Sequence, residues 1–356
     1  YTDYDKENGI EKSAVELVGF TKTDSIEPGK DQTVTVSVDK EVMKAYDAAN
    51  AKTYVVDAGD YYFTAASDAH EALNNILAAK GYTTENGMDA DGNADMTYKT
   101  TVDSLDTTTY AKSTETGNDI TNQFADVDIR YYDDSFTYLT RSDWSGSFPS
   151  TYAEGNMTAS DALLSDLQWD RSDDVVNDGS SMPEFEKDSD KKVSDAKDAS
   201  YDDEIWSELV SELSADRAMQ LVRQGGYATI QADDIGLPAT TDKDGTSGIS
   251  GTLVGGQSAM AYPVEAVMAC TWNTDLLYEM GLSLGEDSIN TGVAGWYAPG
   301  VDIHRSPYSG RNFEYFSEDG FLSGQLAGNE VKGAREKGVI TYMKHFALND
   351  QETNRY

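Results

Sequence analysis

Residues 338–345, GVITYMKH, decide how the C-terminal part of the chain is interpreted. The first six of them, GVITYM, have the short apolar pattern of a buried β-strand. Lys344 and His345 follow directly where that strand is expected to end. In α/β folds, ligand sites gather at the carboxyl ends of parallel strands. We therefore expect a ligand site at the end of this strand.

The segment before this strand alternates between predicted helices and predicted strands. Such alternation, with fully apolar strands, is typical of a parallel sheet in either a (β/α) barrel or a doubly wound fold. Helices are expected over residues 202–213, 214–224, 272–286 and 319–338, the second of them capped by Ser214, and strands over VEAVMAC (264–270), GWYAPGVDI (295–303) and GVITYM (338–343).

The N-terminal part has a different pattern, which predicts an all-β region over residues 1–84. In QTVTVSVD (32–39), three valines alternate with Thr and Ser, which indicates a strand buried on one face. EPGK (27–30) is a Pro-Gly turn that leads into this strand. KTYVVDAGDYYFTAAS (52–67) contains two β-rich runs around Asp-Ala-Gly-Asp, a hairpin pattern. Together these predict a small antiparallel β-sandwich.

Residues 85–201 are acidic and rich in turn-forming residues, so we interpret them as a polar connector between the two folded regions. Their low apolar content predicts that they form no core of their own. DADGNAD (89–95) superficially resembles a calcium-binding loop. An EF-hand loop needs Gly at its sixth position and Glu at its twelfth, whereas this segment has Gly92 fourth and Thr100 twelfth. We expect an acidic loop tip there.

Charge and composition limit the partners of the chain. Its 356 residues contain 64 acidic and 27 basic side chains, a formal net charge of −37. Such a field repels nucleic acid and anionic membranes. The single cysteine, Cys270, excludes an internal disulfide framework and a Cys-cluster metal site, and three histidines make a multi-His zinc site unexpected. Neither a Cys-cluster nor a multi-His metal site is therefore expected. The composition favours an exported or cell-surface protein over a cytoplasmic one, and homo-oligomerisation is left open.

Polar residues at separate predicted strand ends form the candidate site. Asp244 lies in the glycine-flanked turn DKDGTSGI (242–249), Arg311 follows the strand ending near residue 303, and Lys344 and His345 follow GVITYM. Carboxylate, guanidinium, ammonium and imidazole groups can each bond to the hydroxyls of a neutral sugar. Taken singly, each has a simpler interpretation: a solvated Lys-His loop, or a plain ion pair between Arg311 and Glu314.

At these residues the sequence resembles glycoside hydrolase family 3, the β-glucosidase-like enzymes. The resemblance covers roughly residues 202–356, and its motifs occur in family order: DGTSGI (244–249), ACTWNTDLLYEMG (269–281), HRSPYSGRNFEYFSEDG (304–320) and VKGAREKGVITYMKHFALNDQETNR (331–355).

This resemblance implies the first part of a (β/α)8 TIM-like barrel over residues 202–356, belonging to an exo-acting retaining β-glycosidase without cofactor or metal, with β-glucosidase activity favoured. The substrate would be a β-linked oligosaccharide or glycoside. Asp244, Arg311, Lys344 and His345 would hold the non-reducing terminal sugar in the −1 subsite. Thr246 stands where the family turn usually has proline.

VELVGFTKTDSIEPGKDQTVTVSVD (15–39) resembles the fibronectin-III-like domain of the same family. In most members that domain follows the barrel, whereas here it precedes it. The resemblance therefore implies a reversed-order member whose fibronectin-like domain lacks its first strands. Both ends look cut, and the remaining segments of the parent polypeptide would be partners of this chain.

The resemblance leaves the nucleophile and the acid/base unassigned. Retaining glycosidases need two carboxyl groups about 5–5.5 Å apart. The family nucleophile often lies in a Ser-Asp-Trp context after the Lys-His-Phe motif. Here Ser-Asp-Trp places Asp143 ahead of the barrel, in a loop-like context, so we interpret it as a coincidence. Asp350 and Glu352 are read as helix-start or barrel-wall residues. Both catalytic carboxylates are expected outside the chain.

Two other classes of function stay open on the sequence. One is a non-catalytic carbohydrate-binding or adhesive surface protein, built from a fibronectin-like module and an inactive barrel. The other is a barrel lyase that uses Lys344 as a Schiff base. A Schiff-base lysine requires an apolar pocket or nearby cations, whereas acids surround Lys344 in the sequence.

Overall fold

A computed structural model of the chain describes residues 1–3, 10–122, 138–147, 160–168, 184–250, 259–346, 349–350, 352 and 355. The chain divides into two compact units, residues 1–175 and 176–356. Much of the predicted connector (123–137, 148–159 and 169–183) lies outside the described residues. The helices of the described part are all too short or too polar to span a bilayer.

Unit 1 contains two small antiparallel pairs of strands. β1 pairs with β2, and β3 pairs with β4 in a six-residue register that runs from Gly59 opposite Val102 to Thr64 opposite Thr97. The regular elements of unit 1 are η1 (Lys40–Met43), β1 (Ala45–Asp47), β2 (Thr53–Val55), β3 (Gly59–Thr64), α1 (Ala69–Ala79), η2 (Ala94–Met96), β4 (Thr97–Val102), α2 (Trp144–Ser147) and α3 (Asp161–Asp166).

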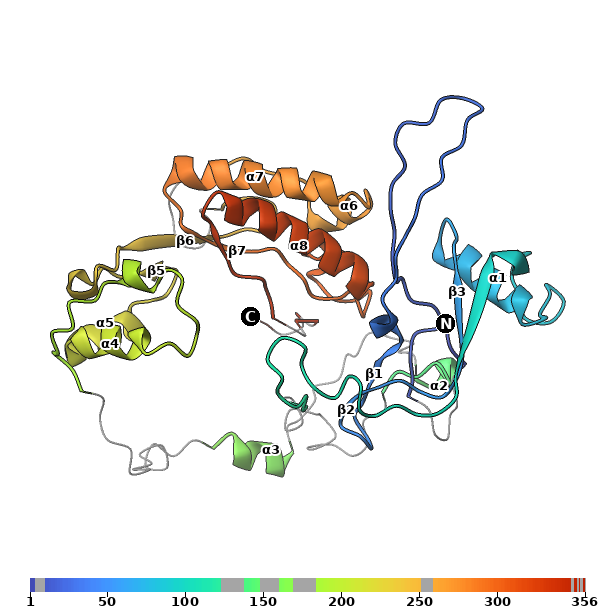
Figure 1. Ribbon diagram of the computed structural model, residues 1–356, viewed down its shortest axis with the longest axis horizontal. Helices are drawn as coiled ribbons and strands as arrows, with labels where there is room; N and C mark the ends of the chain where they lie inside the picture. The colour runs from blue at the N-terminus through green and yellow to red at the C-terminus, as the bar shows by residue number, and fades with distance from the viewer. Residues whose placement is uncertain are drawn as a thin grey trace. The chain divides into compact units, whose positions relative to one another are not determined.

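Two expectations for this unit were wrong. The predicted strand 32–39 is instead one arm of a long loop (Figure 1), and its valines are about 40% exposed: Val34 43%, Val36 43% and Val38 39%. Alternation buries a face only where a second layer covers it, and here Val36 meets the facing arm at Gly19. The hairpin predicted over residues 52–67 is also wrong, because β2 and β3 each pair with a different strand.

The structure agrees with the predictions of a turn at EPGK and a loop at DADGNAD. Lys30 donates its backbone N–H to Glu27 at 3.0 Å, and Gly29 adopts a φ of 76°, so the predicted turn is confirmed. The loop packs on α1, where Asn74 donates to Asp89 at 2.8 Å and Asn75 accepts the N–H of Asn93 at 2.7 Å.

Unit 2 is an α/β layer built on a four-stranded sheet in the order β5-β6-β7-β8. β6, β7 and β8 are parallel, and β5 is antiparallel to β6. The regular elements of unit 2 are η5 (Val193–Ala196), α4 (Ile205–Glu212), α5 (Ala215–Arg223), β5 (Ala228–Thr229), η6 (Asp233–Ile235), β6 (Thr240–Asp244), α6 (Glu265–Ala269), α7 (Thr274–Thr291), β7 (Gly295–Tyr297), η7 (Asn312–Glu314), α8 (Gly320–Glu336) and β8 (Ile340–Thr341).

The helices α5, α7 and α8 begin close to where the sequence predicts. The side chain of Ser214 accepts the N–H of Arg217 at 3.1 Å, that of Asn273 accepts the N–H of Leu276 at 3.2 Å, and that of Asp319 accepts the N–H of Leu322 at 2.7 Å. Each bond satisfies a donor that the first helical turn leaves unpaired. α7 ends at Gly292, whose φ of 72° closes the helix in the left-handed conformation.

The core of unit 2 lies between the helix pair and the sheet. α7 and α8 run side by side over the strands (Figure 1). The predicted buried face of α7 (Leu277, Met280 and Leu284) is confirmed. Removing these side chains from water is the main source of stability for the layer. The central cluster joins both helices to β7 and consists of Ile249, Leu284, Val293, Trp296, Ala298, Ala334 and Val339.

Three sequence interpretations of unit 2 need correction. VEAVMAC is helix α6, not a strand, because a short apolar run does not distinguish the two. β6 was missed, because its buried positions carry Asp242 and Lys243 instead of apolar residues. The strand GVITYM shortens to β8, whose Ile340 is 52% exposed.

The region predicted as a connector contributes to both units. β4 pairs with β3 in unit 1, and Ala196 of η5 packs with α4 and η6 in a small apolar cluster of unit 2. The segment therefore takes part in packing on its neighbours, as an ordered-by-contact connector would. The boundaries at residues 84 and 201 stay a prediction.

Candidate active site

The sheet of unit 2 brings residues from distant parts of the sequence to one edge. Asp244 ends β6 and lies opposite Tyr297 in the parallel register with β7. Beyond β8, Lys344 forms a parallel bridge with Gly300, donating its N–H to Pro299 at 3.0 Å and accepting the N–H of Val301 at 2.7 Å. Asp244 and Lys344 therefore both lie at the carboxyl ends of parallel strands.

Lys344 lies between two carboxylates. Its Nζ is 2.7 Å from Oδ1 of Asp244 and 3.5 Å from Oε2 of Glu314, and its side chain is only 13% exposed. Because two carboxylates hold this ammonium, it lacks the apolar or cationic surroundings that a Schiff-base lysine requires. The contacts thus disfavour the lyase hypothesis.

Arg311 joins the same group of charges through Glu314. The guanidinium pairs with Glu314, one turn along η7, and lies 3.6 Å from Glu352. The hydrogen bond with Glu314 raises the pKa of Arg311 above its ordinary value. Lys344 and Arg311 are therefore held on opposite oxygens of one carboxylate, Oε2 and Oε1 of Glu314.

His345 is held by a second set of contacts. Its backbone N–H donates to Asp302 at 2.7 Å, and its Nδ1 lies 3.0 Å from the hydroxyl of Tyr315. Burial, followed by the positive charges of Arg311 and Lys344, lowers the pKa of His345 below its ordinary value. The imidazole is therefore neutral at pH 7.

The structure brings together all four residues that the sequence singled out. Asp244 contacts Lys344, Lys344 and Arg311 share Glu314, and His345 is the next residue in the chain. Their side chains are 13–33% exposed, so they present polar groups at a surface without being fully solvated. This set of cationic, anionic and neutral groups can bond to several hydroxyls of one ligand.

Three residues of this cluster were not predicted as part of the site: Glu314, Tyr315 and Asn349. Glu314 was read only as an ion-pair partner of Arg311, whereas it also reaches Lys344. Asn349 donates from its side chain to the hydroxyl of Tyr315 at 2.8 Å. The polar residues that follow the Lys-His pair were a signal for Asn349, but nothing in the sequence linked it to Tyr315.

Asp350 and Asp143, two carboxylates weighed in the sequence, each have local contacts. Arg305 pairs with Asp350, its Nε lying 2.8 Å from Oδ2. Asp143 belongs to unit 1, where its Oδ1 accepts the N–H of Gly146 at 2.9 Å in the first turn of α2. That bond gives Asp143 a local helix-starting role, and its exclusion as nucleophile stays a prediction.

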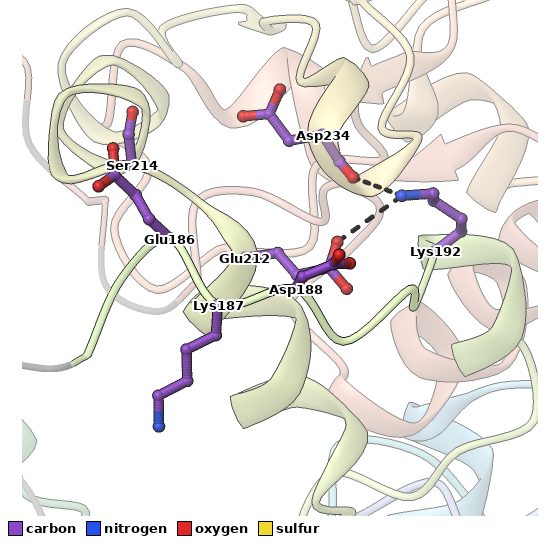
Figure 2. A pocket seen from close by; sticks show the side chains of 7 residues that line it. All are labelled: Glu186, Lys187, Asp188, Lys192, Glu212, Ser214 and Asp234. Carbon is purple, nitrogen blue, oxygen red and sulfur yellow. Dashed lines mark hydrogen bonds and ion pairs between the residues drawn. The ribbon is translucent and has the colours of Figure 1, made fainter.

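A separate polar pocket of about 430 Å³ occurs in unit 2 (Figure 2). Lys192 is bound to the backbone carbonyl of Asp234 at 2.6 Å and lies 3.6 Å from Glu212, while Lys187 points away from the others (Figure 2). These contacts tie the segment before α4 to α4 and η6. The pocket is lined by Glu186, Lys187, Asp188, Lys192, Glu212, Ser214 and Asp234.

Two carboxyl groups are buried behind the site. Glu265 of α6 and Glu330 of α8 are both 0% exposed. Glu265 accepts the N–H of Gly300 at 2.8 Å, whereas neither carboxyl oxygen of Glu330 has a partner among the described residues. Burial raises the pKa of Glu330 to about 8, and burial together with the charge of Glu330 raises that of Glu265 well above its ordinary value. Within the described residues, no three His, Cys, Asp or Glu side chains gather closely enough to hold a metal ion.

Comparison with known proteins identifies a domain family in each part of the chain. Residues 206–354 match the model of the glycosyl hydrolase family 3 N-terminal domain, which includes the whole cluster around Lys344. Residues 206–354 belong to glycosyl hydrolase family 3. Residues 1–69 match the fibronectin type III-like domain. The chain thus combines a fibronectin type III-like region with the N-terminal domain of family 3. The expectation that residues 1–84 are all β was wrong in one respect, because α1 (Ala69–Ala79) lies within them.

Relatives in family 3 cover the α/β region. β-Glucosidase A of Butyrivibrio fibrisolvens is 38% identical over 148 residues, which are 42% of this chain and 18% of that protein. Probable β-glucosidase I of Aspergillus clavatus is 43% identical over 130 residues, 36% of this chain and 16% of that protein. The chain therefore matches less than a fifth of the length of these relatives.

One solved β-glucosidase structure is similar to nearly the whole chain. The β-glucosidase of Paenibacillus barengoltzii is similar over 94% of this chain and 33% of its own, with a TM-score of 0.58 and 21% identity. At that identity the likeness shows a shared fold only. The parallel strands β6-β7-β8 do not close into a barrel within the described residues.

Proposed function

We propose that this chain supplies the sugar-binding part of an exo-acting retaining β-glycosidase, with a β-glucosidase favoured and a β-linked glycoside as substrate. The single observation that carries the proposal is the cluster at the strand ends, in which Asp244, Lys344, Arg311 and Glu314 are linked by ion pairs. The names of the curated relatives support the choice of β-glucosides.

In this proposal, the four predicted residues form the −1 subsite. Lys344 and Arg311 donate to sugar oxygens, Asp244 accepts from sugar hydroxyls, and His345 contributes one further polar atom. Each of these four side chains is partly buried and offers hydrogen bonds in a fixed direction. A pocket selects a hydroxylated ligand through such polar groups. We propose further that β6, β7 and β8 are the first part of a (β/α)8 barrel and that the fibronectin-like region is a β-sandwich.

The proposal assigns no catalytic carboxylate to this chain. Among the described residues of the site, Asp244 and Glu314 hold Lys344, Glu352 pairs with Arg311 and Arg355, and Asp302 accepts two backbone N–H groups. A nucleophile must be free to attack the anomeric carbon, and an acid must carry a proton. These four carboxylates are committed to positioning, so the chain binds the sugar and the chemistry needs a further pair of carboxyl groups.

The experiment measures glucose binding and turnover of an aryl β-glucoside by the 356-residue chain. Asp244→Asn and Lys344→Met should weaken glucose binding at least tenfold, whereas Lys332→Met, an exposed cation of α8, should leave it unchanged. Absence of glucose binding by the folded wild-type chain would contradict the subsite. Binding that persists in both site variants would move the sugar elsewhere, in favour of the carbohydrate-binding surface protein.

A further inference from the structure

The contacts of His345 determine which of its ring nitrogens carries the proton. The chain of contacts starts at the side-chain amide of Asn349, which contacts Tyr315, the hydrogen-bond partner of His345. This amide faces Oε1 of Glu352 at 3.3 Å and the hydroxyl of Tyr315 at 2.8 Å. A hydrogen bond from Arg355 lowers the pKa of Glu352, so this carboxylate is ionised and only accepts hydrogen bonds. The amide nitrogen of Asn349 must therefore be the atom that faces both groups, and Tyr315 accepts its hydrogen bond.

The direction of the hydrogen bond from Asn349 to Tyr315 determines where the hydroxyl proton of Tyr315 points. The tyrosine is 1% exposed, and burial raises its pKa, so the phenol keeps its proton at neutral pH. Its oxygen already accepts from Asn349, and Nδ1 of His345, at 3.0 Å, is the acceptor that the described contacts offer to the hydroxyl. A buried hydroxyl proton without an acceptor would cost about 1–3 kcal/mol. The proton therefore points to Nδ1.

Asp302 does not reverse this assignment. Its Oδ2 lies 3.5 Å from Nδ1 of His345, beyond the range of a good N–H···O bond, and the same oxygen accepts the backbone N–H of His345 at 2.7 Å. The lowered pKa of His345 also disfavours the doubly protonated ring. With Nδ1 accepting from Tyr315, the ring proton belongs on Nε2.

We propose that Tyr315 and Asn349 act as positioning residues that hold His345 in its Nε2–H tautomer, so that the ring presents a hydrogen-bond donor to a sugar hydroxyl. The donor chain runs from the Asn349 amide to the Tyr315 oxygen and from the Tyr315 hydroxyl to Nδ1. The sugar part of this inference rests on the proposed function, whereas the tautomer does not. The ligand group selected at Nε2 is an oxygen that can accept, such as a hydroxyl.

The tautomer can be read directly by nitrogen NMR of the ¹⁵N-histidine-labelled chain. The chain has only three histidines, so His345→Gln assigns the signals. We expect wild-type His345 to show an unprotonated Nδ1 and a protonated Nε2 at pH 7. A protonated Nδ1 in the wild type would overturn the proposal.

Two substitutions test the direction of the chain of bonds. Tyr315→Phe removes the donor to Nδ1 and should give a mixture of tautomers, with glucose affinity about fivefold weaker. Asn349→Asp replaces a donor with an acceptor, so the Tyr315 hydroxyl turns toward residue 349 and the His345 proton moves to Nδ1. A residue that only fills space would not produce this reversal.

Controls separate this inference from folding and from the proposed function. Tyr262→Phe removes a hydroxyl bound to Asp287 at 3.0 Å and should leave the His345 signals unchanged. Circular dichroism identifies any variant that fails to fold, and Asn349→Asp then remains as the independent test. If the tautomer follows the prediction but the wild type does not bind glucose, the positioning role stands and the proposed function fails. If the wild type binds glucose but neither substitution changes the His345 nitrogen signals, the positioning role is wrong and the proposed function stands.

Discussion

Nζ of Lys344 lies 2.7 Å from Oδ1 of Asp244, although 100 residues separate them in the sequence and β7 lies between their strands. The pair closes a link across three parallel strands at their carboxyl ends. Because the side chains are largely withdrawn from solvent, each ion is costly without the other. The contact is therefore part of the proposed subsite, and it also stabilises the packing of two distant segments of the chain.

A double-mutant cycle should measure the coupling free energy between Lys344 and Asp244. Lys344→Met leaves two carboxylates without their shared cation, so it should destabilise the chain in urea unfolding. Asp244→Asn in that background should cost less than it does alone, with a coupling free energy of about 1–3 kcal/mol. Additive effects of the two substitutions would show that the pair does not interact in solution.

Asp302 should be essential for the shape of the segment after β8. Its two oxygens accept the backbone N–H groups of His345 at 2.7 Å and Asn349 at 2.8 Å. Asp302→Asn turns one acceptor into a donor that faces an N–H, so residues 345–349 should lose this geometry and glucose binding should fall at least tenfold. Asp319→Asn, which keeps an acceptor at the start of α8, is the matched control and should bind glucose normally. Equal binding by Asp302→Asn and the wild type would contradict the positioning of this segment by Asp302.

The contact between α7 and α8 should respond in opposite directions to two Gly→Ala changes. A Cβ on Gly281 of α7 would meet the backbone oxygen of Glu330 at 2.1 Å, so Gly281→Ala must push the helices apart and destabilise the unit by about 1–3 kcal/mol. Gly328 of α8 has no atom within 4 Å of such a Cβ, so Gly328→Ala should stabilise the helix by about 0.5–1 kcal/mol. Thermal unfolding measures both, and stabilisation by Gly281→Ala would refute the close packing.

Glu330 should make stability depend on pH. Burial raises its folded pKa to about 8 from an ordinary value of 4.5, so the folded chain holds a proton that the unfolded chain releases above pH 4.5. Stability contributed by the neutral form is complete below about pH 4.5 and is lost as pH rises towards 8. One proton corresponds to a slope of at most about 1.4 kcal/mol per pH unit.

The matched variants are Glu330→Gln and Glu279→Gln. The first should reduce the slope of the stability profile between pH 5 and 8, because the amide cannot ionise, and should leave the part of the slope that the raised pKa of Glu265 contributes. The second changes an exposed residue of α7 and should keep the wild-type slope. Urea unfolding at several pH values measures the slope, and an identical slope in Glu330→Gln would show that the carboxyl is not buried in the neutral form.

Local sequence patterns predicted the helices of unit 2 well. Ser214, Asn273 and Asp319 each accept a first-turn N–H, and the apolar face of α7 packs as its period of 3.6 requires. These features depend on residues within one or two turns, so the sequence contains their physical cause. The placement of Lys344 and His345 at a strand end was predictable for a related reason, because the apolar run before them marks a strand and parallel strands deliver their carboxyl ends to one edge. Asp244 was singled out only from its glycine-flanked turn, because the polar strand β6 was missed.

Patterns that depend on a distant partner were misread. The valines of residues 32–39 alternate correctly, yet they are exposed because no second layer covers them in the described structure. VEAVMAC has the apolar run of a strand but forms α6, and the polar TTDKD forms β6 in the sheet. In each case the environment supplied by other segments, and not the local composition, decided the outcome.

The sequence by itself determined the acidic excess, the helix starts, and which polar residues are candidates for the site. Only the tertiary structure decided how those groups are connected, with Glu314 joining Lys344 to Arg311 and Tyr315 joining Asn349 to His345. The physical reason is range. Caps and amphipathic faces are set within a turn of helix. An ion pair or a hydrogen-bond chain instead needs its members within about 3–4 Å, a distance that only the packing of β6, η7 and the segment after β8 establishes.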